Sequence, residues 1–185
     1  LLDAEHGAQP MCSADHRYVL VYNGEIYNYA ELRHELSARW LFRTNTDTEV
    51  VLAAYAVWGE ACLRRFNGMF AFLVWDTHRQ RAFAARDRLG VKPFVYLQQG
   101  AEFLFASEAK GLLPAMQAPR ANIDAVLEYL VAPFFSGVAQ PMFDGMAYLP
   151  PGHLLRLDRD GLQLSRWAPE IAENPAARAD DIAHA

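Results

Sequence analysis

A run of strand-forming residues that leads directly into Asn-Gly-Glu constrains this chain more than any other stretch. Residues 18–22 read Tyr-Val-Leu-Val-Tyr and are followed by Asn23, Gly24 and Glu25. Asn-Gly is the strongest short-range signal for a tight turn, because both residues tolerate positive φ. The sequence therefore predicts a strand that ends at Tyr22 and presents a carboxamide, an unhindered backbone N–H and a carboxylate. Such groups could hold a developing oxyanion beside an ammonium group. The alternative is a plain turn, in which Asn and Gly are present only because they tolerate the backbone conformation of the turn.

The size and composition indicate one globular domain, or one domain and the start of another. The 185 residues are 52% hydrophobic and 21% charged, which is sufficient for a core without disulfides or metal. The net charge of −5 provides no basic face, so nucleic acid is not an expected partner. With two cysteines, no signal peptide and no membrane-length apolar run, we expect a reducing, cytoplasmic location without membrane contact.

Two helix starts follow the Asn-Gly-Glu stretch. Residues 28–31 and 46–49 both have the spacing of a capping box, with Asn28 as the cap of the first. We expect the first helix to run to Arg39 and the second to stop at Gly59, a residue type that suits the position after a helix.

The rest of the domain is expected to be largely antiparallel β-structure with short helical segments. Expected strands are 69–75, 81–86, 94–97, 102–106, 153–157 and 162–167, and expected helical segments are 61–66, 107–113 and 123–131. Residues 132–147 look irregular. Since helices and antiparallel strands come in separate groups, the fold class is α+β. We divide the chain into a domain at 1–167 and a linker, or the start of a further domain, at 168–185.

Few residues outside the Asn-Gly-Glu stretch suggest chemistry. The six histidines have no metal-ligand spacing, and no glycine-rich phosphate loop occurs, so no metal and no cofactor is expected in this domain. Cys12 and Cys62 lack a neighbouring base and are expected to be packing residues. Among the acids Glu25, Asp47 and Glu49, Asp47 stands out, because Thr46 can cap the second helix and leave Asp47 for a ligand. On composition alone we favour the simpler interpretation, in which Asp47 complements the helix dipole, a contribution of ~0.3–1 kcal/mol.

Several motifs occur together along most of the chain. They are Gly7-Ala8-Gln9-Pro10-Met11, Asn23 to Tyr29, Thr46-Asp47-Thr48-Glu49-Val50, Asn67 to Phe72, Ala85 to Pro93, Ala106 to Lys110 and Leu149 to His153. In these motifs the chain resembles the glutaminase domain of glutamine-hydrolysing asparagine synthetases, which are class II glutamine amidotransferases and N-terminal nucleophile hydrolases. The resemblance implies a four-layer α/β/β/α sandwich of two antiparallel sheets, with its N-terminal segment missing.

The same resemblance assigns roles to particular residues. The Asn23 side chain and the Gly24 N–H would form the oxyanion hole for glutamine hydrolysis, and Glu25 and Asp47 would hold the α-amino group of glutamine. Leu1 and Leu2 match the strand that lines the glutamine pocket. Met69 matches a residue on the path by which ammonia leaves, and the loop from Arg86 to Pro93 is expected to be scaffold or a domain contact.

The chain departs from the family pattern at its start and its end. The family's nucleophile is an N-terminal cysteine, whereas this chain begins with Leu1 and is expected to be inactive alone. A C-terminal synthetase domain, which would bind ATP and Mg, is also expected in the parent protein. Expected partners are therefore glutamine, that synthetase domain and, as an open alternative, a second copy in a homodimer.

Three functions stay open at this point. We favour the glutaminase half of an asparagine synthetase, which supplies ammonia for ATP-dependent amidation of aspartate. The alternatives are an inactive amidotransferase-like scaffold or docking module and an amidotransferase that serves a carboxylate other than aspartate.

Overall fold

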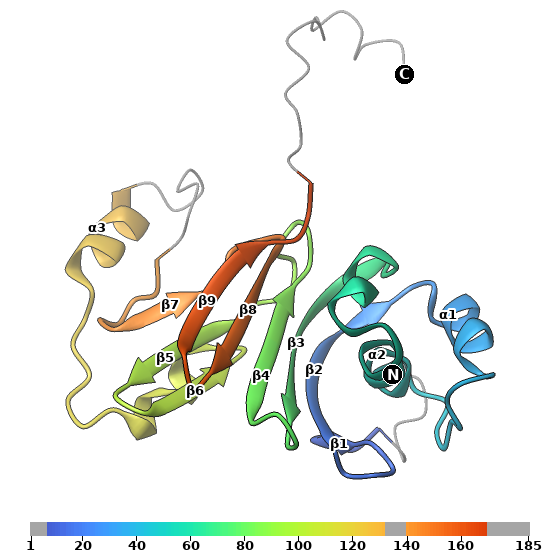
Figure 1. Ribbon diagram of the computed structural model, residues 1–185. Coiled ribbons are helices and arrows are strands. Elements are labelled where there is room, and N and C mark those ends of the chain that lie inside the picture. The colour runs from blue at the N-terminus through green and yellow to red at the C-terminus, as the bar shows by residue number, and fades with distance from the viewer. Residues whose placement is uncertain (1–6, 132–139, 170–185) are drawn as a thin grey trace, which may run out of the picture.

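Antiparallel strands form two sheets in the computed structural model, which describes residues 7–131 and 140–169 (Figure 1). The larger sheet has the order β1 (Met11–Cys12), β2 (Tyr18–Ile26), β3 (Gly68–Asp76), β4 (Arg81–Arg86), β8 (His153–Asp158) and β9 (Gly161–Arg166). The smaller sheet has the order β6 (Glu102–Ala106), β5 (Val95–Gln99) and β7 (Met146–Tyr148).

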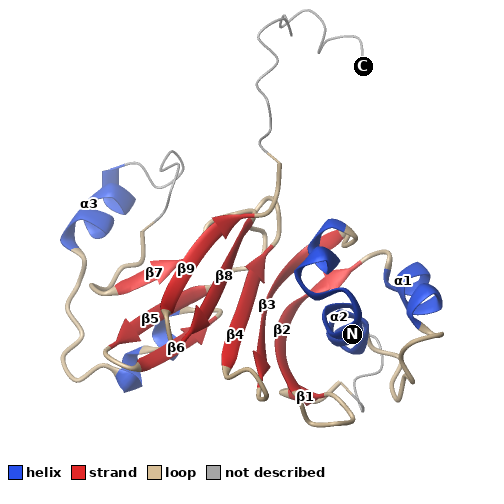
Figure 2. Cartoon of the chain, in the orientation of Figure 1, coloured by secondary structure: helices blue, strands red, loops and turns tan. Residues whose placement is uncertain are grey.

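Two helices cover one face of the larger sheet (Figure 2). They are α1 (Tyr29–Leu36) and α2 (Asp47–Trp58), and α2 leads into a 3₁₀ helix, η1 (Gly59–Arg64). Residues 48–55 of α2 are all buried, because this helix is apolar on nearly every side and fits between α1 and the sheet. Its Tyr55 stacks on Phe83 of β4 with 5.1 Å between ring centroids, which fixes the helix over the sheet.

The second face of the larger sheet packs against the smaller sheet. Small side chains of β3 and β4, such as Ala71, Ala82 and Ala84, make room for Phe94 and Phe105. Beyond the smaller sheet lie two short 3₁₀ helices, η2 (Ala109–Gly111) and η3 (Leu113–Ala115), with Leu112 buried against β5. The expected four-layer α+β arrangement is thus present, and its outermost layer is made of 3₁₀ turns. A third helix, α3 (Ile123–Val131), follows these turns.

Most expected strands and helices are confirmed. The pairs β3–β4, β5–β6 and β8–β9 and the helix α3 lie where the sequence placed them, and the Thr46 hydroxyl caps α2 by accepting from the backbone N–H of Glu49. The short strand β7 was missed within the stretch expected to be irregular. Leu1 and Leu2, the segment 132–139 and the linker from residue 170 lie outside the described residues.

The predicted turn at Asn23-Gly24 is wrong, because β2 continues through both residues to Ile26. Gly24 pairs with Phe70, and a Cβ atom on Gly24 would overlap the carbonyl oxygen of Met69. Glycine is therefore needed here for the close approach of two strands and not for a turn.

The first helix also differs from the prediction. It ends at Leu36 and not at Arg39, and the Asn28 side chain does not cap it. Instead Asn28 Oδ1 accepts from the backbone N–H of Asn67 at 3.0 Å, and its Nδ2 donates to the carbonyl of Arg65 at 3.0 Å. Asn28 therefore ties the start of α1 to the segment that precedes β3. Among the described residues, no helix has both the length and the apolar character needed to cross a membrane.

Candidate active site

The last residues of β2 lie at one end of the larger sheet, where β2, β4 and β9 end and β3 and β8 begin; we call this the site end. Within it, Asn23 pairs with Ala71 and Glu25 pairs with Met69. Directly opposed residues of antiparallel strands share a face, and side chains alternate between faces along a strand. Asn23, Glu25 and Met69 therefore share the face toward the smaller sheet.

The backbone N–H of Gly24 points to the outer edge of β2, away from β3. Tyr22 donates its N–H to Gln9 Oε1 at 2.6 Å, and the Ile26 N–H donates to Asp47 Oδ2 at 3.1 Å, so both face that edge. In an antiparallel ladder, alternate residues direct their backbone groups to the same side. Gly24 lies between Tyr22 and Ile26 in this alternation, and its N–H is therefore aimed at the same outer edge.

Asp47 is brought to that edge by the first turn of α2. Its Oδ2 accepts from the Tyr22 hydroxyl at 2.7 Å and from the Ile26 N–H. Burial, and then the neighbouring Asp47 carboxylate, raises the pKa of the Tyr22 hydroxyl, which keeps it protonated and able to donate. The structure thus places a carboxylate, held from two sides, at the edge of β2 to which the Gly24 N–H points.

The Asn23 side chain is held from the other sheet. Its Nδ2 donates to the Ser107 hydroxyl at 3.2 Å, and Ser107 directly follows β6. Behind this pair is a cavity of about 240 Å³ with a mainly apolar lining that includes Val21, Phe94 and Phe105. Glu25, two residues along the same face, is exposed at the site end. The sequence reasoning did not single out Ser107, although it lies in the Ala106 to Lys110 motif.

Glu49 belongs to the scaffold and not to this group of residues. It is 1% exposed and accepts from the Thr44 N–H at 2.6 Å, the Thr44 hydroxyl at 2.8 Å and the Arg43 N–H at 3.0 Å. Its carboxylate therefore fixes the loop before α2. The acids considered together in the sequence separate into Asp47 and Glu25 near the end of β2 and Glu49 within the scaffold.

The two cysteines lie away from the site end. Cys12 lies in β1 and pairs with Val19. Val19 is four residues before Asn23, which corresponds to about 13 Å along an extended strand. Cys62 is fully buried, and this burial raises the pKa of its thiol. Neither thiol is placed to attack a ligand held by Asn23 and Gly24.

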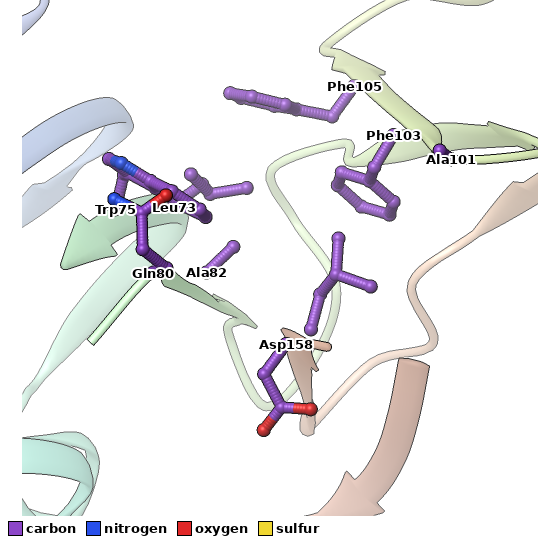
Figure 3. Close-up of a pocket in the computed structure, with 9 residues that line it drawn as sticks. Leu73, Trp75, Gln80, Ala82, Ala101, Phe103, Phe105 and Asp158 are labelled. Atoms are coloured by element: carbon purple, nitrogen blue, oxygen red, sulfur yellow. The ribbon is translucent and has the colours of Figure 1, made fainter. Parts of the chain in front are cut away.

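A larger cavity of about 400 Å³ lies at the opposite end of the sheets (Figure 3). Leu73 and Trp75 of β3 face Phe103 and Phe105 of the smaller sheet across it, and Asp158 lies at the end of β8. Most of its lining is apolar, and among the described residues no group of three His, Cys, Asp or Glu side chains could hold a metal ion. Its polar side chains are Gln80 and Asp158, and none of Asn23, Glu25 and Asp47 lines it.

Comparisons with known proteins give consistent results. A family model described as the glutamine amidotransferase domain matches residues 1–168. The chain is 41% identical over 192 residues to asparagine synthetase (glutamine-hydrolyzing) 3 of Bacillus subtilis strain 168, covering 100% of this chain and 31% of that protein. It is 35% identical over 201 residues to a putative asparagine synthetase (glutamine-hydrolyzing) of Mycobacterium tuberculosis strain H37Rv, covering 99% of this chain and 30% of that protein. The chain thus spans about a third of the length of these relatives.

Solved structures show the same fold. The glutamine phosphoribosylpyrophosphate amidotransferase from B. subtilis matches with a TM-score of 0.60 and 21% identity, covering 88% of this chain and 32% of that chain. A structure described as the allosteric regulatory enzyme of purine biosynthesis matches with a TM-score of 0.62, also at 21% identity, covering 88% of this chain and 32% of that chain.

Proposed function

This chain belongs to the glutamine amidotransferase domain family, and from that premise we propose that it is the glutaminase part of a glutamine-hydrolysing asparagine synthetase. It would release ammonia from glutamine for the ATP-dependent amidation of aspartate elsewhere in the protein. The observation that carries this proposal is that the Asn23 carboxamide, the Gly24 N–H and the Asp47 carboxylate all lie at the same end of β2.

Asn23 and Gly24 are assigned to the oxyanion hole. Hydrolysis of the glutamine side-chain amide passes through a tetrahedral intermediate whose oxygen becomes negative, and preorganised N–H donors stabilise it. The carboxamide of Asn23 has two N–H bonds, so that one can remain with Ser107 while the other donates to the oxyanion. Loss of one such donor typically costs ~2.7–4 kcal/mol of transition-state stabilisation.

Asp47 and Glu25 are assigned to the α-ammonium group of glutamine. Because Asp47 Oδ2 accepts from Tyr22 and Ile26, we assign the ammonium group to Asp47 Oδ1. Each charge-assisted hydrogen bond of this kind contributes roughly 1.5–3 kcal/mol. Leu1 and Leu2 would line the same pocket.

The nucleophile and the second reaction are assigned to other parts of the protein. Neither of the two cysteines of the chain reaches the site end, and we therefore assign the catalytic thiol to a further cysteine of the full-length protein. Met69 shares a face with Glu25 and is assigned to the path of the released ammonia. ATP and Mg would belong to the synthetase domain, and residues 168–185 would lead into it.

The experiment that tests this function uses the full-length protein. We expect glutamine to be converted to glutamate, and we expect Asn23→Ala to reduce this rate by about 10²–10³-fold. Asparagine synthesis from free ammonia should continue in the same variant, because the synthetase domain does not need the oxyanion hole. A wild-type protein that makes no glutamate from glutamine would overturn the proposal and favour an inactive scaffold. If the protein amidates an acceptor other than aspartate, the proposed acceptor is wrong and the proposed glutaminase activity stands.

A further inference from the structure

The loop from Arg86 to Pro93 is held rigidly by one buried carboxylate. Asp87 is 2% exposed, and its two oxygens accept from the backbone N–H groups of Phe70, Leu89, Val91 and Lys92 at 3.0–3.2 Å. A carboxylate that binds several N–H groups of one loop fixes that loop in a single conformation. Asp87 therefore ties the loop to the start of β3.

A guanidinium group holds the same loop from its other side. Arg86 donates to the carbonyl oxygens of Lys92 at 2.7 Å, Gly90 at 2.7 Å and Leu149 at 2.8 Å. These three acceptors come from the loop and from the segment before β8, so Arg86 joins the two segments. The loop is thus ordered before it meets any partner.

This rigid loop presents apolar side chains to solvent. Leu89 is 72% exposed and Val91 is 55% exposed. The buried Asp87 carboxylate and the partly buried Arg86 guanidinium hold this loop in place while its tip remains apolar, an arrangement that core packing does not require. It does suit a contact surface, because a preordered loop loses little conformational entropy on binding.

The loop lies beside the last described residues of the chain. The Trp167 indole N–H donates to the Arg86 carbonyl at 3.0 Å, and the Arg88 guanidinium lies 5.0 Å from the centroid of the Trp167 ring. The loop after β4 and the end of β9 lie together at the upper end of the larger sheet in Figure 1. The site end therefore carries three features on one side of the molecule: the residues assigned to glutamine, the apolar loop tip and the exit of the chain.

We propose that Leu89 and Val91 are the docking contact for the part of the full-length protein that follows residue 169. This inference rests on the proposed function, in which that part is the synthetase domain. The relatives are about three times longer than this chain, and the chain that would lead to a following domain passes the loop at Trp167. The complementary surface would be an apolar depression with carboxylates facing Arg88 and Lys92.

Such a contact has a consequence for the reaction. The Asp87 carboxylate binds the N–H of Phe70, the residue after Met69, so the docking loop adjoins the residue assigned to the ammonia path. A domain seated on Leu89 and Val91 would close the site end to bulk water at the point where ammonia is released.

Thiol labelling of the full-length protein tests the contact directly. Leu89→Cys should react with a maleimide about tenfold or more slowly than Leu41→Cys, because modification of a docked side chain requires the domains to separate first. Leu41 is the matched control, because it is 90% exposed and lies in the loop between α1 and α2. Labelling is quantified on the individual peptides by mass spectrometry, and both sites should react equally in denaturant. Equal rates at the two sites in the native protein would overturn the proposal.

A second variant tests whether the contact couples glutamine hydrolysis to asparagine synthesis. In Leu89→Asp/Val91→Asp we expect glutamate formation to persist while glutamine-dependent asparagine synthesis falls several-fold relative to synthesis from free ammonia. Unchanged coupling would contradict the proposal. The labelling result does not depend on activity, so a protein without glutaminase activity but with a protected Leu89→Cys would overturn the proposed function and leave the docking contact standing.

Discussion

The carboxamide of Asn23 donates to the hydroxyl of Ser107, with 3.2 Å between Nδ2 and Oγ, and this bond joins the two sheets at the candidate site. An asparagine side chain without such a partner can rotate about its terminal bond. The bond to Ser107 therefore decides which way the remaining N–H of the carboxamide points.

Ser107→Ala should lower kcat for glutamine hydrolysis by about 2- to 12-fold, the equivalent of one neutral hydrogen bond of ~0.5–1.5 kcal/mol. KM should change little, because in the proposed mechanism Asn23 acts mainly on the transition state. Steady-state glutaminase kinetics of the full-length protein measure both. Ser107→Thr keeps the hydroxyl and should restore most of kcat, whereas a parallel rise in KM would indicate a general disturbance of the pocket. Ser37→Ala, in the helical layer, serves as the control.

Tyr22→Phe should raise KM for glutamine. The Tyr22 hydroxyl holds Asp47 Oδ2 at 2.7 Å, and without it the carboxylate assigned to the substrate ammonium loses one of its two supports. Hydrogen bonds to charged groups contribute ~1.5–3 kcal/mol, so a loss of stability of this order should accompany the kinetic effect. Tyr55→Phe is the control, since Tyr55 is also buried but packs beneath α2 against Phe83. A KM that stays at the wild-type value would remove Asp47 from the substrate-binding group.

The protein should lose stability in alkaline solution above pH 10. Burial raises the pKa of Tyr55 to about 12, and burial together with Asp47 raises the pKa of Tyr22. A raised pKa means that the folded state keeps a proton which the unfolded state releases near pH 10, so this contribution to stability is complete below pH 10. It is then lost as the pH rises toward the folded pKa, at up to about 1.4 kcal/mol per pH unit for each tyrosine. Urea unfolding at pH 9, 10 and 11 measures this slope, and Tyr55→Phe should make it shallower.

Local signals predicted much of the fold. The Thr46 cap is made by residues three positions apart, and the nearly unbroken apolar run of β3 is a property of its own residues. Both were correctly predicted because no distant partner decides them. The same holds for the β8–β9 hairpin, whose strands are joined by a short turn.

The errors arise where a distant segment decides the local conformation. Asn23-Gly24 has the composition of a turn, but pairing with β3, more than 40 residues away, extends the strand through both residues. The Asn28 side chain bonds with Asn67, 39 residues away, and is thereby taken from the helix it was expected to cap. Ser107 is 84 residues from Asn23, so no spacing rule could have connected them.

Asp87→Asn should destabilise the protein more than its conservative chemistry suggests. The two carboxylate oxygens accept from four backbone N–H groups. In Asp87→Asn an NH₂ group would replace one of these oxygens, and because it is a donor it could not accept from the backbone N–H groups that it faces. Each buried N–H left without an acceptor costs ~1–3 kcal/mol, and the loss should therefore exceed that of any single exposed hydrogen bond. Asp158→Asn is the matched control, because that carboxylate accepts from the Asp160 N–H in an exposed turn. Urea unfolding compares the two variants, and equal stabilities would show that Asp87 does not hold the loop.

Since the loop carries Leu89 and Val91, Asp87→Asn should also weaken glutamine-dependent synthesis relative to synthesis from ammonia, which links the order of the loop to the proposed docking contact.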